Sequence, residues 1–215
     1  MNATKNATLY GAAGSGSVAV EATLRLLGID YTLIEGATWA EPAARNRVAP
    51  ANPMRQIPTL VLADGEVLTE SAAILIYLAD LHPASGLSPA VDDPLRGRFL
   101  RWMLYVSSAI YALHWIKPDV RRVGVPLALR DTVVDAVHDR IAFCWSTMDQ
   151  RLAPVGPYLL GERLTVLDLY VNVVSRFGPW RERFVKAAPT MAPLVQRVDD
   201  DPRLAQFWLD RFSFD

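Results

Sequence analysis

Hydrophobic and polar positions in the first third of the chain alternate between strand-like and helical spacing. Residues 8–10 form a short strand-like run that stops at residues 11–16, where three glycines allow a tight turn. Helical spacing follows over about residues 18–27 and ends at Gly28, as a helix with a C-terminal glycine cap would. Residues 31–34 then predict a second strand, so the opening unit is strand, helix, strand.

A second unit is centred on the dipeptide Asp64-Gly65, which is typical of a two-residue hairpin turn. It separates the strand-like residues 57–62 from residues 67–68, and these two runs are predicted to pair as a β-hairpin. From residue 71 to about residue 80, apolar residues at helical spacing form a stripe suited to packing on a sheet. The first part of the chain therefore predicts an α/β domain with the order βαβ, then ββα.

Beyond residue 94 no convincing strand pair is evident, and apolar residues keep helical spacing. Residues 83–94 concentrate proline, glycine, serine and aspartate, which is the composition of an exposed connection. We therefore expect a first domain at residues 1–83, a linker at residues 84–94 and an all-helical bundle domain at residues 95–215. Helices are expected over residues 95–115, 127–152, 166–177 and 204–211.

Residues 164–169 carry the signals of a helix N-terminus. Thr165 can cap a helix whose third residue, Asp168, reaches back to it, and Leu164 can pack on Leu169. This combination predicts a capping box with a hydrophobic staple.

Composition excludes several classes of protein. Of 215 residues, 51% are hydrophobic and 21% are charged, as in an ordinary globular protein. The 22 basic and 23 acidic side chains give a formal net charge of −1, and no run of one sign marks a nucleic-acid surface. The N-terminus lacks an apolar stretch of signal-peptide length, and nowhere do about 18 uncharged apolar residues run together as in a membrane span. We therefore expect a cytoplasmic protein with no nucleic-acid or membrane partner.

Candidate redox and metal-binding residues are sparse. The single cysteine, Cys144, cannot form an internal disulfide, and its apolar neighbours indicate a buried thiol within a helix. His82, His114 and His138 are scattered, so no metal site is expected. The glycines of residues 11–16 lack the terminal lysine and the spacing of a phosphate-binding loop.

The strongest local signal is the segment 52–60, in which Pro58 stands at the start of a strand next to a loop. A proline at such a place is either an edge residue or part of a cis peptide bond. A cis bond would turn the N–H and C=O of the preceding residue, Ile57, away from the sheet, where they can pair with the backbone of a peptide.

This strand with the sequence QIPTL, the hairpin after it, and residues 69–74 opening a helix resemble the glutathione site of the cytosolic glutathione transferases. The resemblance extends from Leu9 to about Phe207. It implies a thioredoxin-like N-terminal domain, a C-terminal helical bundle, a cis bond before Pro58, and glutathione as co-substrate. The glutathione-binding residues that it implies are Arg55, Gln56, Ile57, Pro58, Glu70 and Ser71.

The resemblance also gives these residues expected partners on the tripeptide. The main chain of Ile57 would bind the cysteinyl main chain as an added strand would. Ser71, at a helix N-terminus, would bind the γ-glutamyl carboxylate, and Glu70 would bind the ammonium group. Arg55 would bind the glycyl carboxylate, for which a guanidinium fork is suited. Glu70 and Ser71 are also explained by an ordinary helix cap.

Catalysis in such an enzyme needs a glutathione thiolate, so a hydroxyl near the first helix must lower the thiol pKa from about 8.5. Aligning the first strand with the family places Ser15 where serine-type members keep the catalytic hydroxyl, and Tyr10 where tyrosine-type members keep theirs. Ser17 is a third candidate that is also explained as a helix cap. Gly16 falls where cysteine-type members form mixed disulfides, which disfavours a disulfide reductase.

The second substrate is expected between the domains, where aromatic residues recur along residues 95–115. Most of these, such as Trp102 and Tyr105, are expected in the core. Tyr111 and Trp115, near the end of this helix, are expected to touch the electrophile, and His114 is expected at the surface.

The sequence thus predicts an enzyme, a glutathione S-transferase that activates the glutathione thiol as a thiolate and conjugates it to a small hydrophobic electrophile. A non-catalytic binding module with the same fold, or a glutathione-dependent peroxidase or isomerase, stays as an alternative. The resemblance further implies a two-fold homodimer.

Overall fold

The computed structural model describes residues 6–37, 39, 41–177 and 180–212 of the chain. Its first part contains a four-stranded mixed sheet with the strand order β2-β1-β3-β4. Strand β1 (Ala7–Gly11) pairs in parallel with β2 (Tyr31–Glu35) and antiparallel with β3 (Thr59–Val61). Strand β3 in turn pairs antiparallel with β4 (Val67–Leu68). The predicted thioredoxin-like sheet followed by a helical part is confirmed.

The register of the strands brings three loops to one edge of the sheet. Tyr10 lies opposite Thr59, so the turn after β1 and the residues before β3 meet at the same edge. Leu60 lies opposite Leu68, so β4 also ends at this edge and leads into helix α3 (Ser71–Leu81). Strand direction alone therefore makes neighbours of three segments that are far apart in the sequence.

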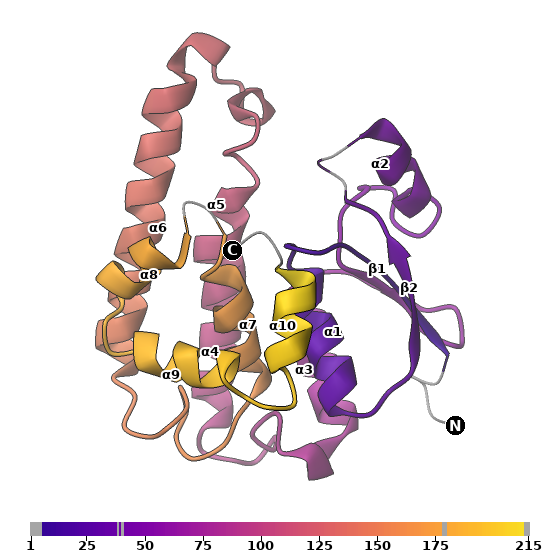
Figure 1. The fold of residues 1–215 in the computed structure, drawn as a ribbon, viewed down its shortest axis with the longest axis vertical. Coiled ribbons are helices and arrows are strands. Elements are labelled where there is room, and N and C mark those ends of the chain that lie inside the picture. Colours follow the sequence, from indigo (N-terminus) through magenta and orange to yellow (C-terminus); the bar gives the residue numbers. More distant parts are fainter. Residues whose placement is uncertain (1–5, 38, 40, 178–179, 213–215) are drawn as a thin grey trace.

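Helices α1 (Ser17–Leu26) and α3 lie between the sheet and the helical half of the molecule (Figure 1). Helix α1 ends as predicted, because Gly28 is left-handed at φ +64° and the Ile29 amide donates to the Leu24 carbonyl at 3.0 Å. Helix α2 (Pro42–Val48) was not predicted. Only Ala44 and Val48 of α2 are buried, so its sequence carries no longer apolar stripe.

The predicted β-hairpin forms, but the expectation of a two-residue turn at Asp64-Gly65 is wrong. The Leu62 amide donates to the Glu66 carbonyl at 2.9 Å, and the Gly65 amide donates to the Leu62 carbonyl at 3.0 Å, so residues 63–65 form the loop. Gly65 is left-handed at φ +90°, whereas Asp64 is not. A two-residue type I′ turn needs two left-handed residues, and a three-residue loop needs only one.

The later part of the chain is mostly helical, and each of the four predicted segments contains a helix: α4 (Arg96–Tyr105), α6 (Arg130–Leu152), α7 (Val166–Val174) and α10 (Ala205–Arg211). The short helices α8 (Trp180–Ala187) and α9 (Ala192–Asp199) and three 3₁₀ turns were not predicted: η1 (Pro83–Ser85), η3 (Val120–Val123) and η4 (Leu127–Leu129). The domain boundary at residues 84–94 stays a prediction.

The predicted helix over residues 95–115 is not one regular α-helix. After α4 the chain forms a π-helical segment, η2 (Val106–Tyr111), and then α5 (Ala112–His114). An added residue in a helical turn rotates every later side chain by about 100°. Tyr111 therefore points in a different direction from the one that regular spacing from Trp102 and Tyr105 predicts.

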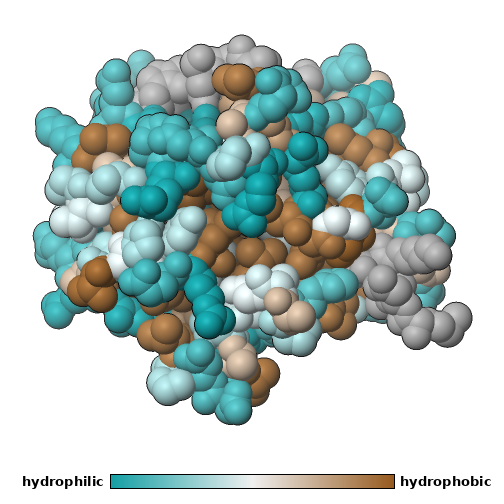
Figure 2. All heavy atoms as spheres, turned by 60° about the horizontal axis from the view of Figure 1, so that its bottom comes forward, coloured by the Kyte–Doolittle hydropathy of each residue, from teal (hydrophilic) through white to brown (hydrophobic). Residues whose placement is uncertain are grey.

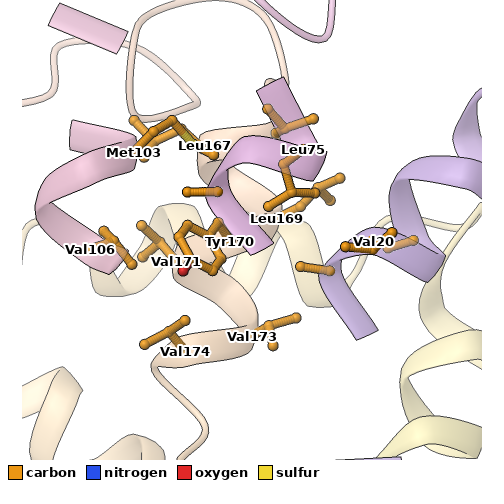
Figure 3. Close-up of a cluster of buried hydrophobic side chains, with 14 of the residues drawn as sticks. Val20, Leu75, Met103, Val106, Leu167, Leu169, Tyr170, Val171, Val173 and Val174 are labelled. Carbon is orange, nitrogen blue, oxygen red and sulfur yellow. The ribbon is translucent and has the colours of Figure 1, made fainter. Parts of the chain in front are cut away.

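Helix α7 lies in the centre of the core, and all nine of its residues are buried. Figure 3 shows its apolar side chains among residues of three other helices and of the π-helical segment: Val20, Leu75, Met103 and Val106. Seven of the nine residues of α7 are apolar or aromatic, and the two polar ones, Asp168 and Asn172, are hydrogen-bonded, so the helix is suited to an enclosed position. Helix α7 thereby joins α1 and α3, which cover the sheet, to the helical half.

Hydrophobic residues also reach the surface. Figure 2 shows them gathered in a hollow across the middle of the face that it presents, with mostly hydrophilic residues around it. Such gatherings mark contact surfaces more often than scattered apolar residues do. Within the described residues, no helix combines the length and the apolar character needed to cross a membrane.

The buried carboxylate of Asp168 organises the N-terminus of α7. Its Oδ2 accepts hydrogen bonds from the amide of Thr165 at 2.8 Å and from the hydroxyl of Thr165 at 2.7 Å. Its Oδ1 accepts a bond from the amide of Leu159 at 2.8 Å. The predicted capping box is confirmed. Burial raises the pKa of Asp168 to about 6, although these hydrogen bonds act in the opposite direction.

We expect Asp168→Ala to lower the free energy of unfolding by about 2–4 kcal/mol, because three buried donors lose their acceptor. Urea unfolding followed by circular dichroism measures this change. Asp131 provides a matched control, since it is an exposed carboxylate in the first turn of α6. Asp131→Ala should change the stability by less than about 0.5 kcal/mol. Equal unfolding curves for the two variants would contradict the structural role of Asp168.

Candidate active site

Two of the three candidate hydroxyls lie together in the turn between β1 and α1. The hydroxyls of Ser15 and Ser17 are 2.8 Å apart, and both side chains are buried. Ser15 Oγ also donates to the Ala12 carbonyl at 2.8 Å and accepts from the Ser17 amide at 3.1 Å. Ser17 Oγ accepts from the Ala12 amide at 2.9 Å. The tight turn therefore holds two interacting hydroxyls at the start of a helix.

The third candidate hydroxyl, Tyr10, lies elsewhere. Leu9 is fully buried in the core on the face of β1 that also holds α1. Tyr10 follows it in the strand and so points to the opposite face, where it is half-buried. The structure brings Ser15 and Ser17 together and leaves Tyr10 apart from them.

Tyr111 reaches this turn from the helical half. Its Oη accepts a hydrogen bond from the Gly16 amide at 3.1 Å. Burial raises the pKa of Tyr111 above its usual value, so this hydroxyl keeps its proton at neutral pH. Its ring packs on Tyr170 at 6.3 Å and on Phe177 at 5.2 Å between centroids. Gly16 is required here, because a Cβ atom would lie 2.3 Å from Tyr111 Oη.

Two further ring side chains follow Tyr111 in the sequence, His114 and Trp115. Trp115 is 46% exposed, and the guanidinium of Arg122 lies over its ring at 5.1 Å. The expectation that His114 is a surface residue is wrong, because its Nε2 is buried and its ring packs edge-on against Phe177 at 5.4 Å. Burial lowers the pKa of His114 to about 3, so the imidazole is neutral.

The loop before β3 contains the predicted cis peptide bond between Ile57 and Pro58. Strand pairing of β3 begins at Thr59, so the main chain of Ile57 lies outside the ladder. Buried Asn52 braces this loop, since its Oδ1 accepts from the Met54 amide at 3.0 Å and its Nδ2 donates to the Gln56 carbonyl at 3.1 Å.

Two side chains of this loop, those of Arg55 and Gln56, face outward. Arg55 and Gln56 are exposed, and Arg55 has a left-handed backbone at φ +54°. A left-handed arginine is uncommon and holds the side chain in a direction that the neighbouring turn imposes. The loop therefore exposes unpaired main-chain groups at Ile57, and the cationic side chain of Arg55 lies two residues earlier in the sequence.

The N-terminus of α3 provides the third segment of the site. Glu70 precedes the helix in an unusual conformation, with φ +64° and ψ 107°, and its side chain is exposed. Ser71 is buried, and its Oγ lies 2.8 Å from the hydroxyl of Tyr170. A simple helix cap by Ser71 is not formed, because α3 has no side-chain cap bond. Residues with an unusual backbone conformation, such as Glu70, are concentrated at binding sites.

Several residues that support these segments were missed by the sequence analysis. They are Glu21, Asn52, Tyr170 and Arg211, each of which is polar or ionic and contacts one of the three segments or the first turn of α1. Asn52 belongs to the segment 52–60 that predicts the glutathione site, so its polar side chain could have been recognised as a support for this loop. Glu21 lies four residues after Ser17, so the spacing of one helical turn was also a signal. Tyr170 and Arg211 act across long sequence separations, for which one sequence gives no pattern. Within the described residues, no group of histidine, cysteine and carboxylate side chains has the arrangement of a metal site.

Comparison with known proteins identifies the family. A family model described as the N-terminal domain of glutathione S-transferase matches residues 17–81. Glutathione S-transferase GST-4.5 of Xanthomonas campestris is 32% identical over 177 residues, covering 79% of this chain and 81% of that protein. The uncharacterized GST-like protein YncG of Escherichia coli is 28% identical, with 92% of this chain and 95% of that protein covered.

A solved structure has the same architecture along almost the whole chain. The crystal structure of a glutathione transferase homologue from Sulfitobacter, with bound glutathione, superposes with a TM-score of 0.80. It is 25% identical and covers 94% of this chain and 96% of its own. Together with the relative from Xanthomonas, this likeness shows that the chain belongs to the glutathione S-transferase family.

We expect Gly16→Ala to lower the free energy of unfolding by about 1–3 kcal/mol, because the new methyl group overlaps the ring and hydroxyl of Tyr111. Thermal unfolding measures the loss. In a Tyr111→Ala background the same Gly16→Ala substitution should cost less, because the overlapping side chain is already absent. Gly97→Ala is the control, since nothing lies within 4 Å of a Cβ atom at this helical position. A Gly16→Ala variant as stable as Gly97→Ala would contradict the contact.

Proposed function

We propose that this protein binds glutathione at the edge of the sheet where the three segments meet and conjugates it to a small hydrophobic electrophile. The observation that carries the proposal is the convergence of the Ser15–Ser17 turn, the cis bond at Ile57–Pro58 and the N-terminus of α3. The bound glutathione of the Sulfitobacter relative, which has the same fold, supports this ligand.

The three segments offer a complementary group for each part of the tripeptide. The main chain of Ile57, outside the strand ladder and turned by Pro58, suits the cysteinyl main chain. The amides at the start of α3, with Ser71 beside them, suit the γ-glutamyl carboxylate, and the exposed Glu70 suits the ammonium group. The exposed Arg55 suits the glycyl carboxylate, and Gln56 adds polar groups next to it.

We assign activation of the thiol to the hydroxyl of Ser15. Ser15 lies in the turn before α1, whereas Tyr10 points to the other face of the sheet and Ser17 is the first residue of the helix. A hydrogen bond from Ser15 and the positive end of α1 both stabilise a thiolate. The thiol proton passes to solvent, the sulfur forms a bond with the electrophilic carbon, and the leaving group departs with its electron pair.

We assign the second substrate to the space between the sheet half and the helical half. The ring of Tyr111, packed with Phe177 and next to Gly16, supplies an apolar wall close to Ser15, and Trp115 supplies an aromatic face further out. Accordingly, residues 1–83 form the glutathione-binding domain, residues 84–94 the linker and residues 95–215 the domain for the electrophile. An apolar, aromatic wall favours a small hydrophobic compound.

We expect Ser15→Ala to abolish the ultraviolet absorbance of bound glutathione thiolate at neutral pH and to reduce conjugation of a chloronitrobenzene by about 100-fold. Ser108→Ala is the control, because the exposed hydroxyl of Ser108 bonds only locally to the Leu104 carbonyl at 2.7 Å. Unchanged thiolate absorbance in Ser15→Ala would exclude Ser15 as the activating group. If folded wild-type protein neither binds immobilised glutathione nor conjugates, the proposed function itself fails.

We further propose a two-fold homodimer formed through an apolar groove beside α3 and α4. Alanines and larger apolar residues of α3 line the groove with Leu104 of α4: Ala72, Ala73, Ile76, Tyr77 and Leu81. Leu81 is 43% exposed and Leu104 is 59% exposed, although both belong to this contiguous apolar surface. A second copy that presents the same face would cover it.

Sedimentation velocity of the wild type should therefore give a dimer, and Leu81→Glu with Leu104→Glu should give a folded monomer, because two carboxylates enter the apolar contact. Val155→Glu, at a position that is 98% exposed, should leave the dimer intact. A monomeric wild type at micromolar concentration would refute this assembly.

A further inference from the structure

Arg211 connects the C-terminal helix α10 to three other parts of the chain. Its main-chain carbonyl accepts a hydrogen bond from the Gly14 amide at 2.9 Å, next to Ser15. Its guanidinium donates to Glu21 Oε1 of α1 at 2.9 Å and to Glu35 Oε1 of β2 at 2.7 Å. Figure 1 shows α10 lying beside α1, in agreement with these contacts. Arg211 therefore contacts the turn that carries the hydroxyls through its main chain, and it contacts the adjoining helix and strand through its side chain.

Glu21 is an acidic side chain in an almost fully buried place. Its side chain is 2% exposed, and that of Arg211 is 15% exposed. Burial raises the pKa of Glu21, while the charge and hydrogen bond of Arg211 oppose that rise. The other titratable groups that act on Glu21 and its surroundings are Glu35 and Tyr31 on β2 and Arg25 on α1. Glu21 also reaches the site, because Ser17 Oγ lies 3.2 Å from its Oε1.

Ser15, Ser17 and Glu21 form a chain of hydrogen bonds, and each hydroxyl has only one proton to donate. Ser17 has one proton and three acceptors within reach: Ser15 Oγ at 2.8 Å, Glu21 Oε1 at 3.2 Å and the Ala12 carbonyl at 3.3 Å. If the proton goes to Ser15, then the proton of Ser15 itself can go to the Ala12 carbonyl at 2.8 Å or outward to a bound ligand. If the proton goes to Glu21, then Ser17 becomes an acceptor for Ser15, and the Ser15 proton points inward. A strong acceptor at Glu21 therefore adds Ser17 to the Ala12 carbonyl as an inward acceptor for Ser15 and disfavours the outward direction of the Ser15 hydroxyl.

We propose that Arg211 is a positioning residue that, by satisfying the carboxylate of Glu21, directs the proton of Ser15 toward the glutathione sulfur. The guanidinium supplies charge-assisted bonds to Glu21, so the carboxylate draws the Ser17 proton less strongly than it would without Arg211. The hydrogen bond from the Gly14 amide to the Arg211 carbonyl holds the turn that carries Ser15 against the end of α10. This inference rests on the proposed function, and it makes thiol activation depend on the docking of the C-terminal helix.

The test compares four proteins: the wild type, Arg211→Met, the double variant Glu21→Gln with Arg211→Met, and the control Arg203→Met. Arg211→Met keeps the main-chain bond to Gly14 and most of the side-chain length, but leaves Glu21 without its cation. The double variant also removes the negative charge of Glu21. Arg203→Met breaks the ion pair with Asp201 at 2.6 Å, just before α10, without reaching the turn. The thiolate absorbance of bound glutathione and kcat/KM for a chloronitrobenzene are measured against pH.

In Arg211→Met the pKa of bound glutathione should rise by about one unit, with about a tenfold loss of kcat/KM at neutral pH that is recovered at alkaline pH. The double variant should return the pKa toward the wild-type value, and Arg203→Met should not move it. A merely structural role would lower stability and leave the pH profile in place. Should Arg211→Met fail to fold, a double variant with wild-type pKa supports the proposal, and one with a raised pKa overturns it.

Two results overturn the inference and are distinguishable. A folded Arg211→Met with the wild-type pH profile refutes the role of Arg211 while leaving the proposed function intact. A wild type that binds glutathione without forming the thiolate refutes both this inference and the proposed activation of the thiol.

Discussion

The docking of α7 against α1 and α3 is the interaction on which the rest of the structure depends. Every residue of α7 is buried, and this packing holds the helical half against the helices of the sheet. Hydrogen bonds between the halves then lie at the site, between the hydroxyls of Ser71 and Tyr170 and from the Gly16 amide to Tyr111. Apolar contact supplies most of the stability, whereas these polar contacts select one relative position, because a buried polar group is costly without its partner.

The hydroxyls of Ser15 and Ser17, in the turn before α1, are connected by hydrogen bonds to a buried carboxylate. Ser15 and Ser17 share their protons with the Ala12 carbonyl and with Glu21, so the electrostatics of a buried carboxylate reach the candidate catalytic oxygen through one intervening hydroxyl. Low local dielectric strengthens each of these interactions. A cation from the end of the chain can therefore influence a group near its beginning without direct contact.

Elements whose cause lies within a few residues were predictable. The glycine that ends α1, the cis bond before Pro58 and the capping box at Thr165 and Asp168 depend on local backbone preferences and short-range hydrogen bonds. The hairpin was also predictable, but its loop length was not, because Asp64-Gly65 is compatible with more than one turn and the pairing of β4 selected the longer one. Helix α2 was missed because two buried residues make no recognisable stripe.

The sequence by itself determined the order of elements and the family resemblance, and it predicted the residues to which we assign glutathione binding, since these follow from short motifs. Only the tertiary structure decided which hydroxyls are neighbours, that Tyr111 touches Gly16, and that the Nε2 atom of His114 is buried. It alone brought Arg211 to Glu21 across 190 residues. Backbone preferences act over a few residues, whereas a buried ion pair forms only after packing has excluded water from both partners.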